Sequence, residues 1–227
     1  MSECKSVIVA RDVSFSYPKG PPLFERLNLT LYQGEFTAIV GENGSGKTTL
    51  GKLLCGILRP AGGSVSILGE ESHNLSLGSI GQKIGYLFQN PDQQLFALTV
   101  REELCWPLQL RGEDAESVRR KVGQVLGRFQ LAGLEDKLPF RLSRGEKQRL
   151  VLAAIMLQRP SYLILDEPTS SLDQERRAGL SQVLQELQAE GIGMAVITHD
   201  SDFLQQHAQR VIQLREGRVV ADERVSP

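Results

Sequence analysis

Short apolar runs along the chain predict a sheet with two kinds of strand. Eight such runs are found, at 7–15, 27–31, 36–40, 63–68, 84–88, 162–165, 194–198 and 211–214. The first, second and fourth alternate apolar with polar residues, as half-buried antiparallel strands do. The third, sixth and seventh are almost continuously apolar, which is typical of parallel strands covered on both faces. We therefore predict an α/β fold with a mixed sheet and an N-terminal antiparallel part.

Helical periodicity is concentrated between the fifth and sixth of these runs. It covers 100–110, 115–129 and 144–157, with turn-forming pairs between the helices. Roughly 70 residues of helix are too many for a single crossover connection. We interpret the segment at about 90–158 as a helical subdomain inserted into one domain spanning 1–227. The core of that domain is expected at 1–89 and 159–227.

A glycine-rich loop follows the third run and leads into a helical stretch. Its order of strand, loop and helix start is that of a P-loop, and its residues are Gly41, Glu42, Asn43, Gly44, Ser45, Gly46, Lys47, Thr48 and Thr49. Backbone N–H groups of such a loop surround a β-phosphate, and the helix dipole adds to the attraction. Lys47 is expected to reach the β- and γ-phosphates, and the Thr48 hydroxyl to hold Mg²⁺. The loop predicts binding of a nucleoside triphosphate.

Two carboxylates, Asp166 and Glu167, end the apolar run at 162–165. Ligands of open α/β sheets bind at the carboxyl ends of the strands. Because successive strand residues point to opposite faces, the two acids are expected to have separate roles. Asp166 suits the Mg²⁺ shell. Glu167 suits polarisation of the attacking water.

Composition and charge indicate a soluble globular protein without a nucleic-acid partner. The 227 residues are 41% hydrophobic and 23% charged, with a formal net charge of −1. Nucleic-acid binders usually have a basic excess. The longest apolar run, 150–157, is far shorter than the ~20 residues of a membrane-spanning helix. Cys4, Cys55 and Cys105 lack metal-ligand spacing and are expected as free thiols in a reducing cytosol.

The start of the third predicted helix resembles the signature motif, LSGGQ, of the nucleotide-binding subunits of ABC transporters. Here the motif is Leu-Ser143-Arg144-Gly145-Glu146, with arginine and glutamate replacing the usual glycine and glutamine. The resemblance implies that Ser143 and the Gly145 backbone cap the γ-phosphate held by the other protomer of a head-to-tail dimer. Ser143 can also serve as an N-cap, with Glu146 completing a capping box. Contact of Arg144 with phosphate, contact with the partner and weakened dimer closure all remain open.

Four further positions match this family, to which the resemblance runs from 7 to about 220. Gln89 resembles the Q-loop glutamine, which approaches Mg²⁺ and links the core to the helical insert. Asp173, in the segment 170–173, resembles the D-loop aspartate that works across the dimer interface. His199 resembles the switch histidine that senses the γ-phosphate, and Tyr17 the aromatic residue that stacks on adenine. The alternatives are a structural or surface role for the histidine and core packing for the tyrosine.

The stretch from Gln89 to Phe96 and its continuation to Leu104 resemble a narrower group, the ATPases of energy-coupling factor transporters, which import vitamins, cobalt and nickel. The resemblance implies that Leu95 and Phe96 border a groove for a coupling helix of a transmembrane scaffold subunit. Ordinary packing of the insert is the alternative. It further implies a second ATPase protomer, identical or different, a substrate-binding membrane subunit, and a peripheral place on the cytoplasmic face of the cell membrane.

The predicted function is an ATPase that energises a membrane importer, with ATP and Mg²⁺ as cofactors. Each site would take Lys47, Asp166 and Glu167 from one chain and Ser143 from the other. Another class of ABC importer or exporter shares the same machinery and stays an alternative. A soluble ABC protein acting on ribosomes or DNA is a second alternative. A P-loop kinase is a third, but it leaves the signature-like motif and His199 unexplained.

Overall fold

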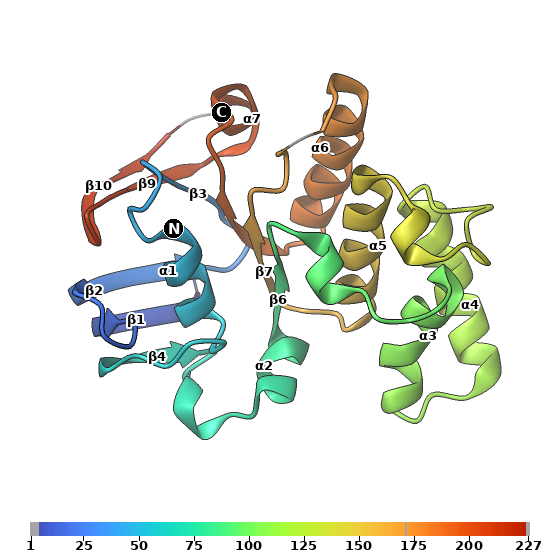
Figure 1. Ribbon diagram of the computed structural model, residues 1–227, viewed down its shortest axis with the longest axis horizontal. Coiled ribbons are helices and arrows are strands. Elements are labelled where there is room, and N and C mark those ends of the chain that lie inside the picture. The colour runs from blue at the N-terminus through green and yellow to red at the C-terminus, as the bar shows by residue number, and fades with distance from the viewer. Residues whose placement is uncertain (1–4, 171, 226–227) are drawn as a thin grey trace.

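Two sheets pack against the first helix, α1 (Lys47–Leu54), in the computed structural model, which describes residues 5–170 and 172–225 (Figure 1). The cysteine at position 4 and the D-loop residue 171 therefore lie outside the described residues. Leu50, Leu53 and Leu54 of α1 are buried between the sheets. Because α1 follows the third strand directly, its N-terminus lies at the carboxyl end of that strand.

The smaller sheet is antiparallel. Its strands are, in spatial order, β2 (Pro22–Tyr32), β1 (Ser6–Ser16), β4 (Gly62–Ile67) and β5 (Glu70–Glu71). β1 pairs antiparallel with both β2 and β4, as the alternating patterns predict. β2 begins earlier than predicted, and β5, which has only two residues, was not predicted.

The larger sheet is parallel except at one edge. Its strands are, in spatial order, β10 (Arg218–Arg224), β9 (Arg210–Arg215), β3 (Phe36–Gly41), β8 (Gly193–Ile197), β7 (Tyr162–Asp166) and β6 (Ile84–Leu87). Every residue of β7 and β8 is buried, which explains their continuous apolar character. β10 alone pairs antiparallel, with β9. The mixed α/β sheet predicted from the sequence is confirmed.

The helices between β6 and β7 gather on one side of the molecule (Figure 1). They are α3 (Val100–Leu110), α4 (Ala115–Arg128) and α5 (Arg144–Leu157), so only the end of the second differs from the prediction. Their apolar side chains share one core cluster with one face of β7 and β8 and with α6 (Gln174–Ala189). None of the helices in the described ranges has both the length and the hydrophobicity needed to cross a membrane.

Several elements were missed by the hydrophobic pattern. They are α2 (Leu77–Lys83), α6, α7 (Ser201–His207), β10 and three short 3₁₀ turns at Ser72–Asn74, Pro91–Gln94 and Pro139–Arg141. α6 buries only a narrow stripe among polar residues, and β10 buries none of its residues. Predicted strand ends at Phe88 and Thr198 are corrected by one residue, because the chain leaves the sheet there to form the site described next.

Candidate nucleotide site

The P-loop leaves the start of α1 open. Gly46 is the N-cap residue, with a left-handed φ of 103°, and no side chain caps the helix. A Cβ at this position would lie 2.8 Å from the Phe24 ring, so both the conformation and the space favour glycine. The first backbone N–H groups of a helix need partners from outside it. An uncapped start therefore offers these donors to an anion.

Lys47 is folded back over the loop that carries it. Its Nζ donates to the carbonyl oxygens of Gly41 and Glu42, each at 2.8 Å. Burial lowers the pKa of the ammonium, and the carboxylates of Glu167 and Asp166 oppose that shift. The ammonium group thus lies in the loop, where it can donate charge-assisted hydrogen bonds to phosphate oxygens.

Asp166 is buried at the end of β7 and is held on both sides of its carboxylate. The Thr48 hydroxyl donates to Oδ1 at 3.2 Å, and the Tyr86 hydroxyl donates to Oδ2 at 3.2 Å. Burial raises the pKa of this carboxyl, while the bonds from Thr48 and Tyr86 act against that rise. A hydroxyl and a carboxylate side by side are hard oxygen donors of the kind Mg²⁺ prefers.

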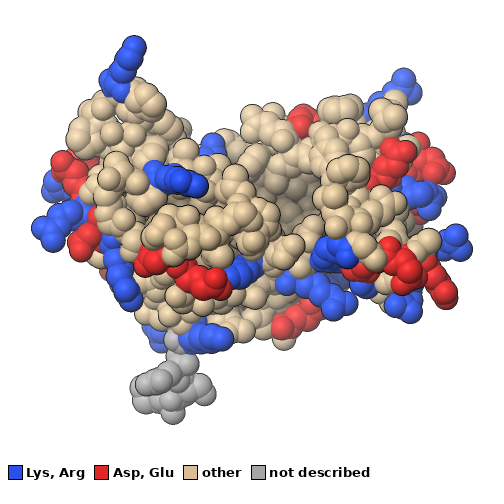
Figure 2. Space-filling model, turned by 90° about the horizontal axis from the view of Figure 1, so that it is seen from below, with Lys and Arg blue, Asp and Glu red and all other residues tan. Residues whose placement is uncertain are grey.

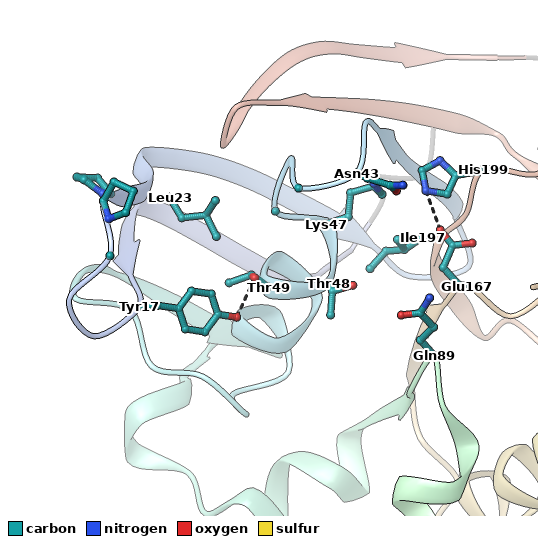
Figure 3. Close-up of a pocket in the computed structure, with 15 residues that line it drawn as sticks. Tyr17, Leu23, Asn43, Lys47, Thr48, Thr49, Gln89, Glu167, Ile197 and His199 are labelled. Atoms are coloured by element: carbon teal, nitrogen blue, oxygen red, sulfur yellow. Dashed lines mark hydrogen bonds and ion pairs between the residues drawn. The ribbon is translucent and has the colours of Figure 1, made fainter.

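Glu167 turns in another direction from Asp166. Its φ of 51° is in the left-handed region, and its N–H donates to the Ile197 carbonyl at 2.8 Å. The carboxylate lies 3.1 Å from Nε2 of His199 (Figure 3). Burial raises the pKa of Glu167, and the neighbouring His199 lowers it. The two acids therefore have different partners, which agrees with the expectation of separate roles.

A cavity of about 550 Å³ joins these groups. Tyr17 lies at one end, with its hydroxyl 3.0 Å from Oγ1 of Thr49, and Glu167 and His199 lie at the other end (Figure 3). Ten of the predicted residues line it, namely Tyr17, Asn43, Gly44, Gly46, Lys47, Thr48, Thr49, Gln89, Glu167 and His199. The cavity wall thus combines five separate parts of the sequence, at 17–23, 43–49, 89, 167 and 197–199, in one elongated hollow of nucleotide size.

Three predicted residues contribute from outside the cavity wall, and sequence reasoning missed others. Gly41 and Ser45 belong to the loop, and the buried Ser45 hydroxyl has no hydrogen-bond partner among the described residues. Asp166 lies behind Thr48. The wall from Gly20 to Leu23 was not predicted, although the three prolines between Tyr17 and Leu23 favour a turn there. Tyr86 was also missed, because an aromatic residue in an apolar strand is typical of the hydrophobic core.

The signature-like residues do not line this cavity. Ser143 caps α5 by accepting from the Glu146 N–H at 3.3 Å, and the Glu146 carboxylate accepts from the Ser143 N–H at 2.6 Å. The capping box is thus present. Gly145 is packed against α6, where a Cβ would lie 3.0 Å from the Arg176 side chain. Within one chain these residues build a helix start rather than a cavity wall.

Arg144 and Asp173 also have partners within the chain. The Arg144 guanidinium donates to the Gln89 carbonyl at 3.2 Å and to the Ser170 hydroxyl at 3.4 Å. Asp173 is the N-cap of α6 and accepts from the Arg176 N–H at 2.9 Å. Arg144 therefore joins the start of α5 to the two loops that follow β6 and β7.

Comparison with known proteins decides the family. The family model described as "ABC transporter" matches residues 24–170. The energy-coupling factor transporter ATP-binding protein EcfA of Methanothermobacter thermautotrophicus is 40% identical over 218 residues, which are 95% of this chain and 70% of the relative. This chain belongs to the ABC transporter family. The EcfA protein of Methanococcus maripaludis is 36% identical over 217 residues, covering 95% of this chain and 78% of the relative.

Solved structures of ABC transporter ATPases have the same fold as this ABC protein. The cbiO1 protein of Clostridium perfringens, described as part of the ABC transporter complex cbiONQ, aligns with a TM-score of 0.87 at 30% identity, over 97% of this chain and 89% of that one. The dimeric ATP-binding cassette MJ0796, bound to ADP and Pi, aligns with a TM-score of 0.87 at 27% identity, over 97% and 99% of the two chains. These likenesses confirm the predicted ATPase subunit of the energy-coupling factor type.

Proposed function

We propose that this ABC protein binds MgATP in the cavity between Tyr17 and His199 and hydrolyses it to drive a membrane importer of the energy-coupling factor type. The observation that carries the proposal is the arrangement around α1, where an uncapped helix start and Lys47 face Glu167 across one cavity. Adenine is assigned to the Tyr17 end, and the triphosphate to the loop that includes Asn43 and Gly44.

The residues around the phosphates have distinct roles in this proposal. Lys47 neutralises the β- and γ-phosphates, and Thr48 and Asp166 hold Mg²⁺, which supplies charge neutralisation when bound. Gln89 lines the cavity beside Glu167 (Figure 3) and would approach the same metal. Glu167 accepts a hydrogen bond from the attacking water and orients it. His199, which touches Glu167, senses the γ-phosphate.

A second protomer completes the site in this proposal. Ser143 and the backbone at Gly145 are assigned to the γ-phosphate of the partner, and Asp173 to the interface. ATP would favour the closed dimer, because only that state brings both sets of contacts to the γ-phosphate. The helical segment at 90–158 acts as the inserted subdomain that carries this second set of contacts.

The membrane partners follow from the same assignment. The dimer would lie on the cytoplasmic face of the membrane, against a transmembrane scaffold subunit and a small substrate-binding membrane subunit for a vitamin or a transition metal. A nucleic-acid partner does not fit the surface seen in Figure 2, where basic and acidic side chains are interspersed.

Isolation of the complex tests the proposal. The tagged chain, extracted from its membranes with mild detergent, is expected to bring down a scaffold protein and a small, very apolar membrane protein, together with ATPase activity. A conventional permease with an extracytoplasmic binding protein would keep the ATPase and change the transporter class. Recovery of ribosomes would contradict transport.

A further inference from the structure

Tyr86 is a buried tyrosine whose hydroxyl reaches the acidic end of β7. Its side chain belongs to β6, is 7% exposed and packs edge-on against Phe88 with the ring centroids 5.1 Å apart. The hydroxyl donates to Oδ2 of Asp166 at 3.2 Å, while Oδ1 accepts from Thr48 at 3.2 Å. The two oxygens of one carboxylate are thus held by two different elements, β6 and α1.

The packing around Tyr86 keeps this hydroxyl in place. A Cβ at Gly51 of α1 would lie 3.2 Å from the tyrosine oxygen, so the absent side chain makes room for the ring. A phenol is protonated at neutral pH, because its ordinary pKa is about 10, and so it can donate a hydrogen bond. Asp166 is its hydrogen-bond partner in the described structure.

We propose that Tyr86 is a positioning residue for the metal site, which fixes the Asp166 carboxylate with Oδ1 beside the Thr48 hydroxyl. This inference rests on the proposed function, because the Mg²⁺ concerned accompanies ATP. Thr48 and Asp166 supply the oxygen donors that such an ion prefers. Without the phenol, Oδ2 would be buried with no donor from β6, and the carboxylate would keep only its hydrogen bond from Thr48. Mutation of a residue that hydrogen-bonds a metal-binding carboxylate typically lowers metal affinity or activity by about 10–100-fold.

Mn²⁺ binding tests this role directly. Tyr86→Phe removes one oxygen and keeps the ring that packs against Phe88. With the full chain saturated with ADP, titration of Mn²⁺ followed by electron paramagnetic resonance is expected to give an affinity about tenfold weaker than wild type. ADP affinity in the presence of a chelator is expected to stay unchanged, since Tyr86 does not line the cavity.

A matched control separates positioning from general packing. Tyr162 is a second buried tyrosine, at the opposite end of β7 from Asp166, and its hydroxyl has no hydrogen-bond partner among the described residues. Tyr162→Phe is expected to leave Mn²⁺ affinity unchanged. In an Asp166→Asn background, Tyr86→Phe is expected to add little further loss, because the hydroxyl acts through that carboxylate.

Three other outcomes would contradict the positioning role of Tyr86. Unchanged Mn²⁺ affinity in Tyr86→Phe would overturn the positioning role and leave the proposed ATP site intact. An equal loss in Tyr162→Phe would also overturn it, by showing a general effect of the core. If the wild-type protein with ADP binds no Mn²⁺, both the proposed metal site and the role of Tyr86 are wrong.

Discussion

The helices α1 and α5 both begin where a phosphate is expected, but their first turns are completed in different ways. At α1 the N-cap is Gly46, and no side chain caps the helix. At α5 the N-cap is Ser143, and Glu146 closes a reciprocal capping box. The first turn of any helix needs partners for its backbone N–H groups. α5 has a partner for one of these groups, the Glu146 N–H, in its own chain, whereas no side chain caps α1.

This difference separates a helix start that lies in a cavity of its own chain from a helix start that would meet a phosphate only across the proposed dimer interface. The start of α1 lies in a cavity with Lys47 on its near side and Glu167 on its far side. The start of α5 lies outside that cavity. In the proposed dimer, a phosphate at α5 comes with the other protomer and joins the capping box already present. The capping box of α5 can stabilise the helix and also bind a phosphate, and variants of Ser143 separate the two roles.

The largest effect is expected at the far wall of the α1 site. Glu167→Gln keeps the size of the side chain but removes the carboxylate that would orient water. Loss of such a group typically lowers turnover by about 10²–10⁴-fold. ATP hydrolysis by the assembled transporter measures this, and ATP binding should persist. The control is Glu175→Gln, a change of the same chemistry at an exposed position of α6, which should leave turnover unaltered.

The same variant should also change stability in a pH-dependent way. Burial raises the pKa of Glu167 above its ordinary 4.5, so the folded state favours the protonated form. The ionised carboxylate therefore costs stability at neutral pH, and this cost disappears as the pH falls below the pKa of the unfolded chain. Glu167→Gln is expected to raise the melting temperature by a few degrees at pH 7 and by less at pH 4. A lower melting temperature at pH 7 would contradict this.

The near side of the α1 site should show the next largest effect. Lys47→Ala removes the ammonium beside the open helix start, and hydrogen bonds to charged groups are worth about 1.5–3 kcal/mol. ATP affinity should therefore fall about 10–100-fold, as measured by calorimetry. Lys52→Ala removes the same charge from the last turn of α1, outside the cavity, and should change the affinity much less. Equal ATP affinities in wild type and Lys47→Ala would contradict the assignment of the triphosphate to this loop.

At α5 the comparison can be sharpened with a second capping box. Thr99 and Glu102 form one at the start of α3, with the same reciprocal bonds as Ser143 and Glu146. Ser143→Ala and Thr99→Ala should each lower the free energy of unfolding by about 1 kcal/mol, measured in urea. Only Ser143→Ala should also reduce ATP hydrolysis by the dimer. Equal hydrolysis in the two variants would leave Ser143 with a capping role alone.

The sequence predicted most of the fold and most of the site for clear physical reasons. Buried parallel strands such as β7 and β8 are apolar throughout, and the P-loop spacing depends on glycine geometry that few other sequences provide. β10 buries none of its residues and so gave no such pattern. The apolar positions 180, 183, 184 and 187 of α6 do have the spacing of an amphipathic helix, and this signal was overlooked. Tyr86 could not be assigned, because its partner Asp166 is distant in sequence and only the pairing of β6 with β7 brings them together.

The smallest effect is expected at Arg144, where the sequence left three alternatives. Its guanidinium is bonded to the Gln89 carbonyl and the Ser170 hydroxyl of its own chain, on an exposed surface. Arg144→Ala should therefore change the free energy of unfolding by less than about 0.5 kcal/mol. It should also change ATP affinity far less than Lys47→Ala does.

Hydrolysis rates then distinguish what Arg144 does in the dimer. The guanidinium joins the start of α5 to the loops after β6 and β7 within one protomer. If closure of the dimer breaks these two hydrogen bonds, the Arg144→Ala dimer should close more readily than the wild-type dimer. It should then hydrolyse ATP somewhat faster. Arg144→Lys keeps the charge without the planar fork and should fall in between. If Arg144→Ala instead lowers the rate as strongly as Ser143→Ala does, the arginine contacts the phosphate across the interface. The start of α5 would then bind phosphate through a basic side chain, as the start of α1 does through Lys47.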